Sequence, residues 1–311
     1  MSGSSTAAEH PPGLPSGTIR RLTTHYGPRV ATWLRSAPDL VFRIATRYDL
    51  SFQGFHDAGW TSVVATATTR VDEQLVIIKA VPDARRFARE ATVLTHWRGN
   101  GSCRLLHADR TDRVLLLPAV GQVGGTRLPA DHQARAAAVI PLLHARPAAA
   151  HPDVSELACS FRQRIAARLM ASPHLNRLCE PDALRNLIRM GHAVLDRAEA
   201  AVMLHADLYR ENLLFDTDGA PAWIDPRGRR GPAEYDWAFW AVLYDRGGFT
   251  ERLKIATDVG EVDRQALLTW VAITAADGLH YHLEVDDRSA AQEMLAILTS
   301  TVVQHAVGRH A

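Results

Sequence analysis

The sequence predicts an α+β protein of two lobes, in which a small β-rich lobe with one key helix precedes a larger helical lobe. Residues 51–81 are rich in β-branched side chains set around turns, which favours strands. After residue 125, apolar residues recur at spacings of three and four, which is typical of helices with one buried face. Between the two patterns lies a Pro/Gly-rich stretch, 118–126, where we expect a hinge.

The bulk composition excludes several classes of protein. The chain has 311 residues and a formal net charge of +1, so nothing indicates a field that would attract nucleic acid or a membrane surface. No apolar run approaches the ~20 residues that a membrane span requires. Residues 1–17 are rich in Ser, Pro and Gly and lack the pattern of a signal peptide, so we expect a disordered tail on a cytoplasmic protein.

The elements of the N-terminal lobe, 18–118, follow from local patterns. A helical preface is expected over 28–49, where Pro38 divides the apolar spacing into two helices. Strands are predicted within 51–81, and two more are predicted within 103–120 on either side of a polar turn. The key helix of this lobe lies between those two groups of strands.

The C-terminal lobe, 119–311, is predicted to hold a short β insert among its helices. Three strand-like pieces follow one another at 201–205, 212–216 and 221–225. The chain is again helical from about residue 233. The β insert matters because polar residues cluster at its turns.

A group of polar residues in this insert predicts phosphoryl-transfer chemistry. The segment LHADLYRENLLFD (204–216) holds Asp207 and Asn212, and PAWIDP (221–226) holds Asp225 at the end of the next strand. A five-residue spacing in a loop between strands can turn both side chains toward one site. Asp207 would accept a hydroxyl proton, while Asn212 and Asp225 would offer oxygen ligands to Mg²⁺.

These motifs resemble the catalytic and metal loops of aminoglycoside phosphotransferases and related antibiotic kinases, which have a protein-kinase-like fold. The usual pattern reads His-Gly-Asp, four residues, Asn, and then Ile-Asp; here Ala206 replaces the glycine and Tyr209 the second histidine. The segment WIDPRGRRGPAEYDWAFW (223–240) is similar to the streptomycin 6-kinase and hydroxyurea kinase branch. The resemblance covers roughly residues 28–300, and it implies that His205 braces the catalytic loop.

The resemblance also implies the nucleotide site. Lys79 closes a predicted strand at the position where the kinase fold places the lysine that meets the α- and β-phosphates. Because Lys79 and Lys254 are the two lysines among 35 basic residues, a retained lysine indicates a need for an ammonium group. Glu90, eleven residues later on the key helix, is expected to pair with Lys79. The alternative for Glu90 is a solvated side chain.

Two further positions are assigned to the nucleotide. A full glycine-rich loop is missing, but backbone amides near Gly59 and the hydroxyl of Ser62 are expected to cover the phosphates of ATP or GTP. Pro118 has no N–H, so the base of the nucleotide would be held by the backbone of Ala119 or Val120.

The substrate side is predicted from charge. Residues 258–293 contain eight acidic residues against two arginines, which favours an anionic pocket for a cationic antibiotic. We assign Asp277 and Glu284 to this pocket, although a solvated helix face with capping acids is an equal alternative. Asp236 is placed at the substrate site, where we expect its carboxylate to bond the catalytic loop or cap the following helix.

We therefore expect an antibiotic O-phosphotransferase, with Mg²⁺ and ATP or GTP, that acts on an aminoglycoside such as streptomycin. The alternatives are a kinase of a nucleoside or peptide antibiotic, and a kinase of a sugar, a choline-like amine or a hydroxyurea-like molecule. A nucleotide-binding pseudokinase is the alternative from another class. A protein kinase is disfavoured because no segment ends in Ala-Pro-Glu. The sequence leaves open whether the protein is a monomer or a dimer.

Overall fold

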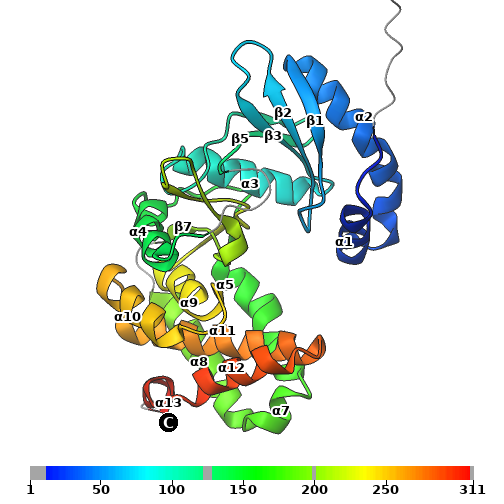
Figure 1. Cartoon of the computed structure of the whole chain (residues 1–311). Helices are drawn as coiled ribbons and strands as arrows, with labels where there is room; N and C mark the ends of the chain where they lie inside the picture. Colours follow the sequence, from blue (N-terminus) through cyan, green and yellow to red (C-terminus); the bar gives the residue numbers. More distant parts are fainter. Residues whose placement is uncertain (1–11, 122–127, 198–200, 309–311) are drawn as a thin grey trace, which may run out of the picture. The chain divides into compact units, whose positions relative to one another are not determined.

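The computed structural model describes residues 12–121, 128–197 and 201–308 (Figure 1). These residues form two compact units. The first contains the chain up to Ala91 together with Arg104–Ala119, and the second contains Thr92–Cys103 and the chain from Val120. Most of the predicted tail and residues 122–126 of the predicted hinge lie outside the described residues.

A five-stranded antiparallel sheet forms the centre of the first unit, in the order β1-β2-β3-β5-β4. The strand pairs β1–β2, β2–β3 and β4–β5 are neighbours in both sequence and space. The strands predicted within 51–81 and 103–120 are therefore confirmed. Their bounds are β1 (Leu50–His56), β2 (Val63–Thr69), β3 (Leu75–Ala80), β4 (His107–Asp109) and β5 (Val114–Pro118).

Three α-helices accompany this sheet: α1 (Ser16–Tyr26), α2 (Ala31–Arg47) and the start of α3 (Ala84–Trp97); the short η1 (Pro28–Val30) links the first two. The prediction that Pro38 divides two helices is wrong, because α2 runs through it. A buried apolar stripe continues on both sides of the proline, and burial of that stripe offsets the missing backbone hydrogen bond. Helix α1 begins at Ser16, inside the segment predicted to be a tail.

The two faces of strand β3 have different partners. Val76, Ile78 and Ala80 belong to the apolar core that the sheet shares with α2. Side chains alternate along a strand, so Lys79 points to the opposite face, where Glu90 of α3 contacts it. The alternation thus separates the core face of the sheet from the face that carries the predicted nucleotide lysine.

The second unit is built around α11 (Arg264–Glu284), which is buried along most of its length. The described residues of the unit also include several shorter helices and turns. Trp237, Trp240, Trp270 and Tyr244 are fully buried, as expected for core aromatics. The other helical elements are α4 (His132–His144), α5 (Leu157–Ser160), η2 (Phe161–Ile165), α6 (Ala166–Ala171), α7 (Leu175–Leu178), α8 (Pro181–Arg197), η3 (Arg210–Asn212), α9 (Ala233–Leu243), α10 (Phe249–Val259), α12 (Arg288–Thr299) and α13 (Thr301–Gly308).

The predicted β insert is confirmed, and its strands belong to two separate sheets. The hairpin β8–β9 pairs antiparallel, and a separate sheet has the order β6-β10-β7. Its strands β6 and β10 were not predicted, because two or three residues give no readable periodicity. The bounds are β6 (Ser155–Glu156), β7 (Val202–Leu204), β8 (Leu213–Phe215), β9 (Pro221–Trp223) and β10 (Arg229–Gly231).

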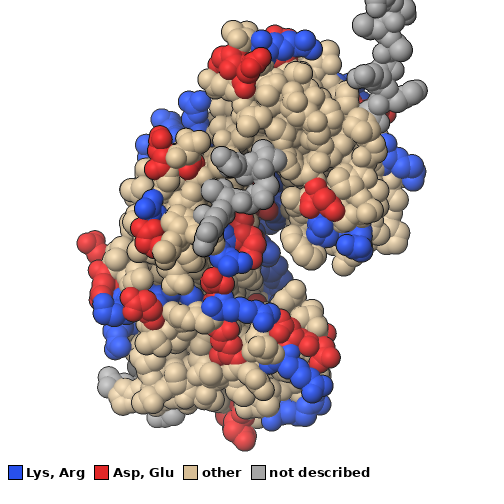
Figure 2. Space-filling view, in the orientation of Figure 1, with Lys and Arg blue, Asp and Glu red and all other residues tan. Residues whose placement is uncertain are grey.

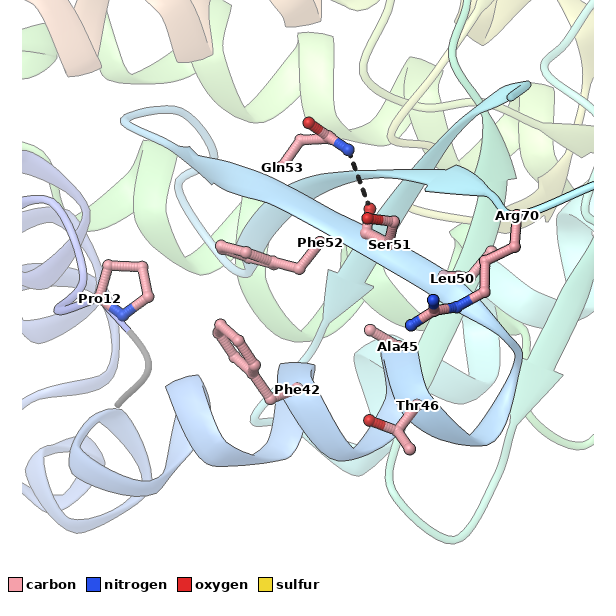
Figure 3. A pocket seen from close by; sticks show the side chains of 9 residues that line it. All are labelled: Pro12, Phe42, Ala45, Thr46, Leu50, Ser51, Phe52, Gln53 and Arg70. Atoms are coloured by element: carbon pink, nitrogen blue, oxygen red, sulfur yellow. Dashed lines mark hydrogen bonds between the residues drawn. The ribbon is translucent and has the colours of Figure 1, made fainter. Parts of the chain in front are cut away.

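Two further observations on the described residues concern membrane-spanning helices and a hollow on the surface. None of their helices combines the length and apolar character that crossing a bilayer demands. An open hollow lies between α2 and β1, where Phe42 and Phe52 line its walls with Arg70 at one end (Figure 3). None of the predicted site residues lines this hollow.

Candidate active site

The hairpin β8–β9 brings the predicted metal ligands together. Asn212 directly precedes β8, and Asp225 follows β9 after one intervening residue. Leu213 pairs with Trp223 in the register of the hairpin, and the backbone N–H of Ile224 donates to the carbonyl of Asn212 at 2.8 Å. Asn212 and Asp225 therefore lie at the same end of one hairpin.

Asp207 is tied to the same end of the hairpin by Asn212. The side-chain Nδ2 of Asn212 donates to the backbone carbonyl of Asp207 at 2.8 Å, and it lies 3.4 Å from Oδ2 of the Asp207 carboxylate. Asp207 is only 8% exposed. The three residues predicted from the sequence thus form one group at this end of the hairpin, where the carboxylate of Asp207 is nearly buried.

Arg227 also contacts Asp207, and the sequence analysis missed it. Its Nε lies 2.9 Å from Oδ1 of Asp207, and its backbone N–H donates to the carbonyl of His205 at 2.9 Å. The side chain of Arg227 is 47% exposed, in contrast to the carboxylate it meets. The available signal was its position two residues after Asp225, in a segment that holds three arginines.

His205 is a structural residue of the loop, as predicted. It is fully buried, and its Nε2 lies 3.0 Å from the carbonyl of Ile224, so Nε2 carries a hydrogen. Its ring stacks on Trp97, with the ring planes 8° apart. Burial lowers the pKa of His205 to about 4, against smaller opposing effects of Asp236 and Asp225. The imidazole is therefore neutral at physiological pH.

Asp236 supports the loop from the first turn of α9. Its two carboxylate oxygens accept hydrogen bonds from the backbone N–H groups of His205 and Ala206, at 2.8 and 2.9 Å. His144 Nε2 lies 3.0 Å from one of these oxygens. Asp236 is fully buried, so its assignment to the substrate site is corrected: the carboxylate is occupied inside the protein and holds the catalytic loop.

The backbone of this loop explains one departure from the family pattern. Ala206 has a φ of 60°, in the left-handed region that favours glycine. The usual glycine at this position avoids a steric cost that alanine bears. The bond from the Ala206 N–H to Asp236 helps to hold the residue in this conformation.

In the first unit, Lys79 and Glu90 form the expected pair. Lys79 Nζ lies 2.5 Å from Oε1 of Glu90, and the two residues are 5% and 0% exposed. The alternative of a solvated glutamate is therefore wrong. The pairing fixes the ammonium group on the face of β3 away from α2.

The other two nucleotide assignments need correction. Ser62 is 1% exposed at the base of the β1–β2 loop, where its side chain packs near Gly59, so its hydroxyl is not presented to a ligand. The N–H of Ala119 donates to the carbonyl of Leu75 at 3.1 Å, which extends the pairing of β3 with β5. Ala119 is thus not a donor for a base, and Val120 is the remaining candidate.

Helix α1 holds the β1–β2 loop, a role that the sequence did not predict. Arg21 contacts Asp57 at 2.7 Å and donates from Nε to the carbonyl of Gly59 at 3.2 Å. Tyr26 donates from its hydroxyl to the carbonyl of Thr61 at 2.9 Å. A loop that lacks the usual glycines is here anchored from outside the sheet.

The predicted acidic pocket contains its own positive charge. Asp277 and Glu284 lie on α11, and Arg168 of α6 approaches them at 3.0 and 3.7 Å. His280 also contacts Glu284 at 3.1 Å, and burial, followed by the charge of Arg168, lowers the pKa of His280. Figure 2 likewise shows basic and acidic side chains interspersed over the visible face, without a continuous acidic field.

Comparisons with known proteins bear on the fold and on the family of this chain. Solved structures with a similar fold include a macrolide 2′-phosphotransferase from Brachybacterium faecium, with 18% identity, a TM-score of 0.54, and coverage of 84% of this chain and 97% of that one. A choline/ethanolamine kinase family protein from Mesorhizobium loti has 15% identity, a TM-score of 0.58, and coverage of 86% and 98%.

A third similar structure is an aminoglycoside phosphotransferase in a ternary complex with AMP-PNP and hygromycin B, with 14% identity, a TM-score of 0.55, and coverage of 87% and 98%. At these identities the structures establish a shared protein-kinase-like fold. The comparison with curated proteins finds no match. Residues 50–282, which include the whole Asp207, Asn212 and Asp225 group, match the family described as aminoglycoside/hydroxyurea antibiotic resistance kinase. The chain therefore belongs to this family of antibiotic resistance kinases.

Proposed function

We propose that this kinase moves the γ-phosphoryl group of ATP or GTP to a hydroxyl group of an aminoglycoside, with streptomycin as the first acceptor to test. The observation that carries the proposal is the grouping of Asp207, Asn212 and Asp225 at one end of the β8–β9 hairpin. The family match and the hygromycin B complex of a fold neighbour support an aminoglycoside acceptor. A cytoplasmic location is part of the same proposal.

Asp207 is assigned the role of orienting the acceptor hydroxyl and accepting its proton. Its carboxylate is nearly buried, and Asn212 holds the adjacent backbone, so the group is fixed before the substrate binds. A fixed carboxylate next to a metal-bound phosphate supplies the positioning and proton acceptance that phosphoryl transfer needs.

The donor set fits Mg²⁺. Asn212 uses its Nδ2 for Asp207, which directs its amide oxygen to the other side as a ligand, and Asp225 offers a carboxylate. The described residues contain no cluster of three or more His, Cys, Asp and Glu that could hold a metal. Mg²⁺ suits such a sparse set, because it takes one or two protein oxygens and completes its shell with phosphate oxygens and water. When bound, the ion would neutralise charge on the phosphates.

Lys79 is assigned to the α- and β-phosphates of the nucleotide. Its ammonium group is held by Glu90 at 2.5 Å, which keeps it oriented. A preorganised cation costs little reorganisation when the nucleotide binds. Because ATP and GTP share these phosphates, the position of Lys79 suits either nucleotide as the donor.

A small amine-bearing metabolite is the second acceptor class. It is favoured by the ion pairs of Arg168, which already neutralise part of the acidic pocket. A pocket of reduced net charge suits a monovalent cation better than a polycation. The choline/ethanolamine kinase family protein among the fold neighbours supports keeping this class in the test. Nucleoside and peptide antibiotics belong in the same acceptor panel.

The experiment is a phosphate-transfer screen with purified protein. ATP and GTP labelled in the γ-position would be offered separately with aminoglycosides, nucleoside and peptide antibiotics, sugars, choline-like amines and hydroxyurea. We expect a labelled aminoglycoside product that requires Mg²⁺. Label transfer to an amine metabolite alone would refute the aminoglycoside acceptor and support the second acceptor class. Binding of nucleotide without transfer to any acceptor would favour the pseudokinase alternative.

Two variants tie the transfer to the proposed residues. Asp207→Ala should lower turnover by orders of magnitude with a small change in melting temperature, since the half-exposed Arg227 can then be solvated. Asp225→Ala should abolish the Mg²⁺-dependent part of nucleotide binding in a calorimetric titration. Turnover like that of the wild type in Asp207→Ala would refute the assignment of the catalytic carboxylate.

A further inference from the structure

Three arginines follow the predicted metal ligand Asp225, and they differ in their surroundings. Arg229 donates to the hydroxyl of Ser155 at 2.6 Å, and Arg230 contacts Glu156, so both are bound to strand β6. Arg227 instead contacts Asp207. Its side chain is 47% exposed, whereas that of Arg230, which also contacts a carboxylate, is 22% exposed. The segment thus places one accessible guanidinium beside the catalytic carboxylate.

The way in which Arg227 contacts Asp207 leaves much of its guanidinium available. The contact uses Nε, at 2.9 Å from Oδ1. Within the part of the chain that the structure describes, the Nη nitrogens of Arg227 make no hydrogen bond or ion pair. A guanidinium is a planar fork of donors that suits carboxylate and phosphate oxygens at the same time. One edge of this fork meets Asp207, and the other is open to an anion.

The backbone around Arg227 is fixed, so the guanidinium has a defined reach. Its N–H donates to the carbonyl of His205, two residues before Asp207, at 2.9 Å. Pro226 precedes it, and Gly228 follows with a φ of 61°, which turns the chain away toward β10. Arg227 is therefore anchored to the catalytic loop by its main chain as well as by its side chain.

Resting on the proposed function, we propose that Arg227 is a further catalytic residue, whose Nη groups bind the phosphoryl group in transfer while its Nε keeps hold of Asp207. The acceptor oxygen forms a bond to the γ-phosphorus as the bond from phosphorus to the β–γ bridging oxygen breaks. The bridging electron pair leaves with the nucleoside diphosphate, and the hydroxyl proton passes to Asp207. Arg227 stabilises the negative charge on the non-bridging oxygens during this exchange.

The test compares a triphosphate analogue with a diphosphate, because Arg227 is assigned to the γ-phosphoryl group alone. AMP-PNP and ADP would be titrated by calorimetry, with MgCl₂, into the wild type, Arg227→Ala and Arg227→Lys. Arg162→Ala is the matched control, since Arg162 is an exposed arginine at the same 2.9 Å distance from a carboxylate, that of Asp196. Melting temperatures would verify that every variant is folded.

We expect Arg227→Ala to weaken the binding of AMP-PNP about tenfold or more, which corresponds to the loss of one charge-assisted hydrogen bond. The affinity for ADP should stay unchanged. The AMP-PNP affinity of Arg227→Lys should lie between those of the wild type and Arg227→Ala, because an ammonium group keeps the charge but lacks the planar set of donors. The lysine variant also serves as the test if the alanine variant fails to fold. Arg162→Ala should bind both nucleotides like the wild type.

The outcomes separate this inference from the proposed function. Equal weakening of AMP-PNP and ADP, or unchanged affinity for both, would overturn the role of Arg227 while leaving the kinase assignment in place. A wild-type protein that binds neither nucleotide would overturn the proposed function and this inference together. Addition of methylguanidinium to Arg227→Ala should restore part of the AMP-PNP affinity, and restoration of ADP affinity instead would contradict a γ-phosphoryl contact.

Discussion

The pair Lys79–Glu90 allows its effect on stability to be separated from its effect on function. Both side chains are almost completely buried, at 5% and 0% exposure, and their charged atoms are 2.5 Å apart. Glu90→Ala leaves the ammonium group buried without its nearest opposite charge. Breaking a buried pair in this way costs about 3–5 kcal/mol of unfolding free energy. Glu90→Gln keeps a hydrogen-bond acceptor, and we expect it to cost about 1–3 kcal/mol.

The double variant Lys79→Met/Glu90→Leu supplies the decisive comparison. Replacing a buried ion pair by apolar side chains of similar volume is often neutral or stabilising, so we expect its unfolding free energy to lie within about 1 kcal/mol of the wild type. Nucleotide affinity should nevertheless be lost, because the phosphates have no lysine to meet.

Urea unfolding and nucleotide titration on the same samples measure the two effects. A loss of less than 1 kcal/mol in Glu90→Ala would contradict the argument from burial. Nucleotide binding like that of the wild type in the double variant would refute the assignment of Lys79. A stable double variant without nucleotide affinity would support both steps of the reasoning.

Three further outcomes follow from the loops around the site. Burial lowers the pKa of His205 from 6.5 to about 4, so the unfolded chain takes up a proton at a higher pH than the folded protein does. Between pH 7 and pH 4, the free energy of unfolding of the wild type should therefore fall by about 3 kcal/mol relative to that of His205→Asn, as measured by paired urea titrations. Ala206→Gly should raise the free energy of unfolding by about 1 kcal/mol, because φ is 60° at this residue, and a lower melting temperature would contradict this. Arg21→Ala, which removes the contacts to Asp57 and Gly59, should speed amide exchange of residues 59–62 several-fold and raise the nucleotide dissociation constant; unchanged exchange would show that α1 does not hold the loop.

Local patterns were sufficient for the main elements and for the chemical core. The many β-branched residues set around turns predicted the strands of the first unit, and the spacing of Asp207, Asn212 and Asp225 predicted their grouping at one hairpin end. A few consecutive residues decide each strand, and a single hairpin between neighbouring strands brings the three polar residues to one end. The pairing of Lys79 with Glu90 was also predicted, because the resemblance to the kinase fold implies it.

Features that depend on distant residues could not be predicted in the same way. Arg227 meets Asp207 across 20 residues of chain, and Asp236 binds the N–H of His205 across 31. The N–H of Ala119 is taken by Leu75, a partner set by the register of β3 with β5. Sequence spacing shows which groups are available for hydrogen bonding, but tertiary contacts decide which of them are already used.

The charges on α11 limit what the acidic segment can contribute to substrate binding. Asp277 and Glu284 are each within 4 Å of Arg168, at 3.0 and 3.7 Å, so a cationic acceptor that binds them has to displace this guanidinium or share its partners. The binding free energy gained is then the difference between the interaction of the acceptor and that of the guanidinium with the same carboxylates, each counted with its cost of desolvation. It is not the full attraction of two unpaired carboxylates. The side chain of Arg168 is 33% exposed, so displacing it from the two carboxylates releases it into solvent, where it regains conformational freedom. A single amine can therefore bind beside the existing ion pairs, whereas a polycation gains the attraction of these two carboxylates only by displacing the guanidinium of Arg168.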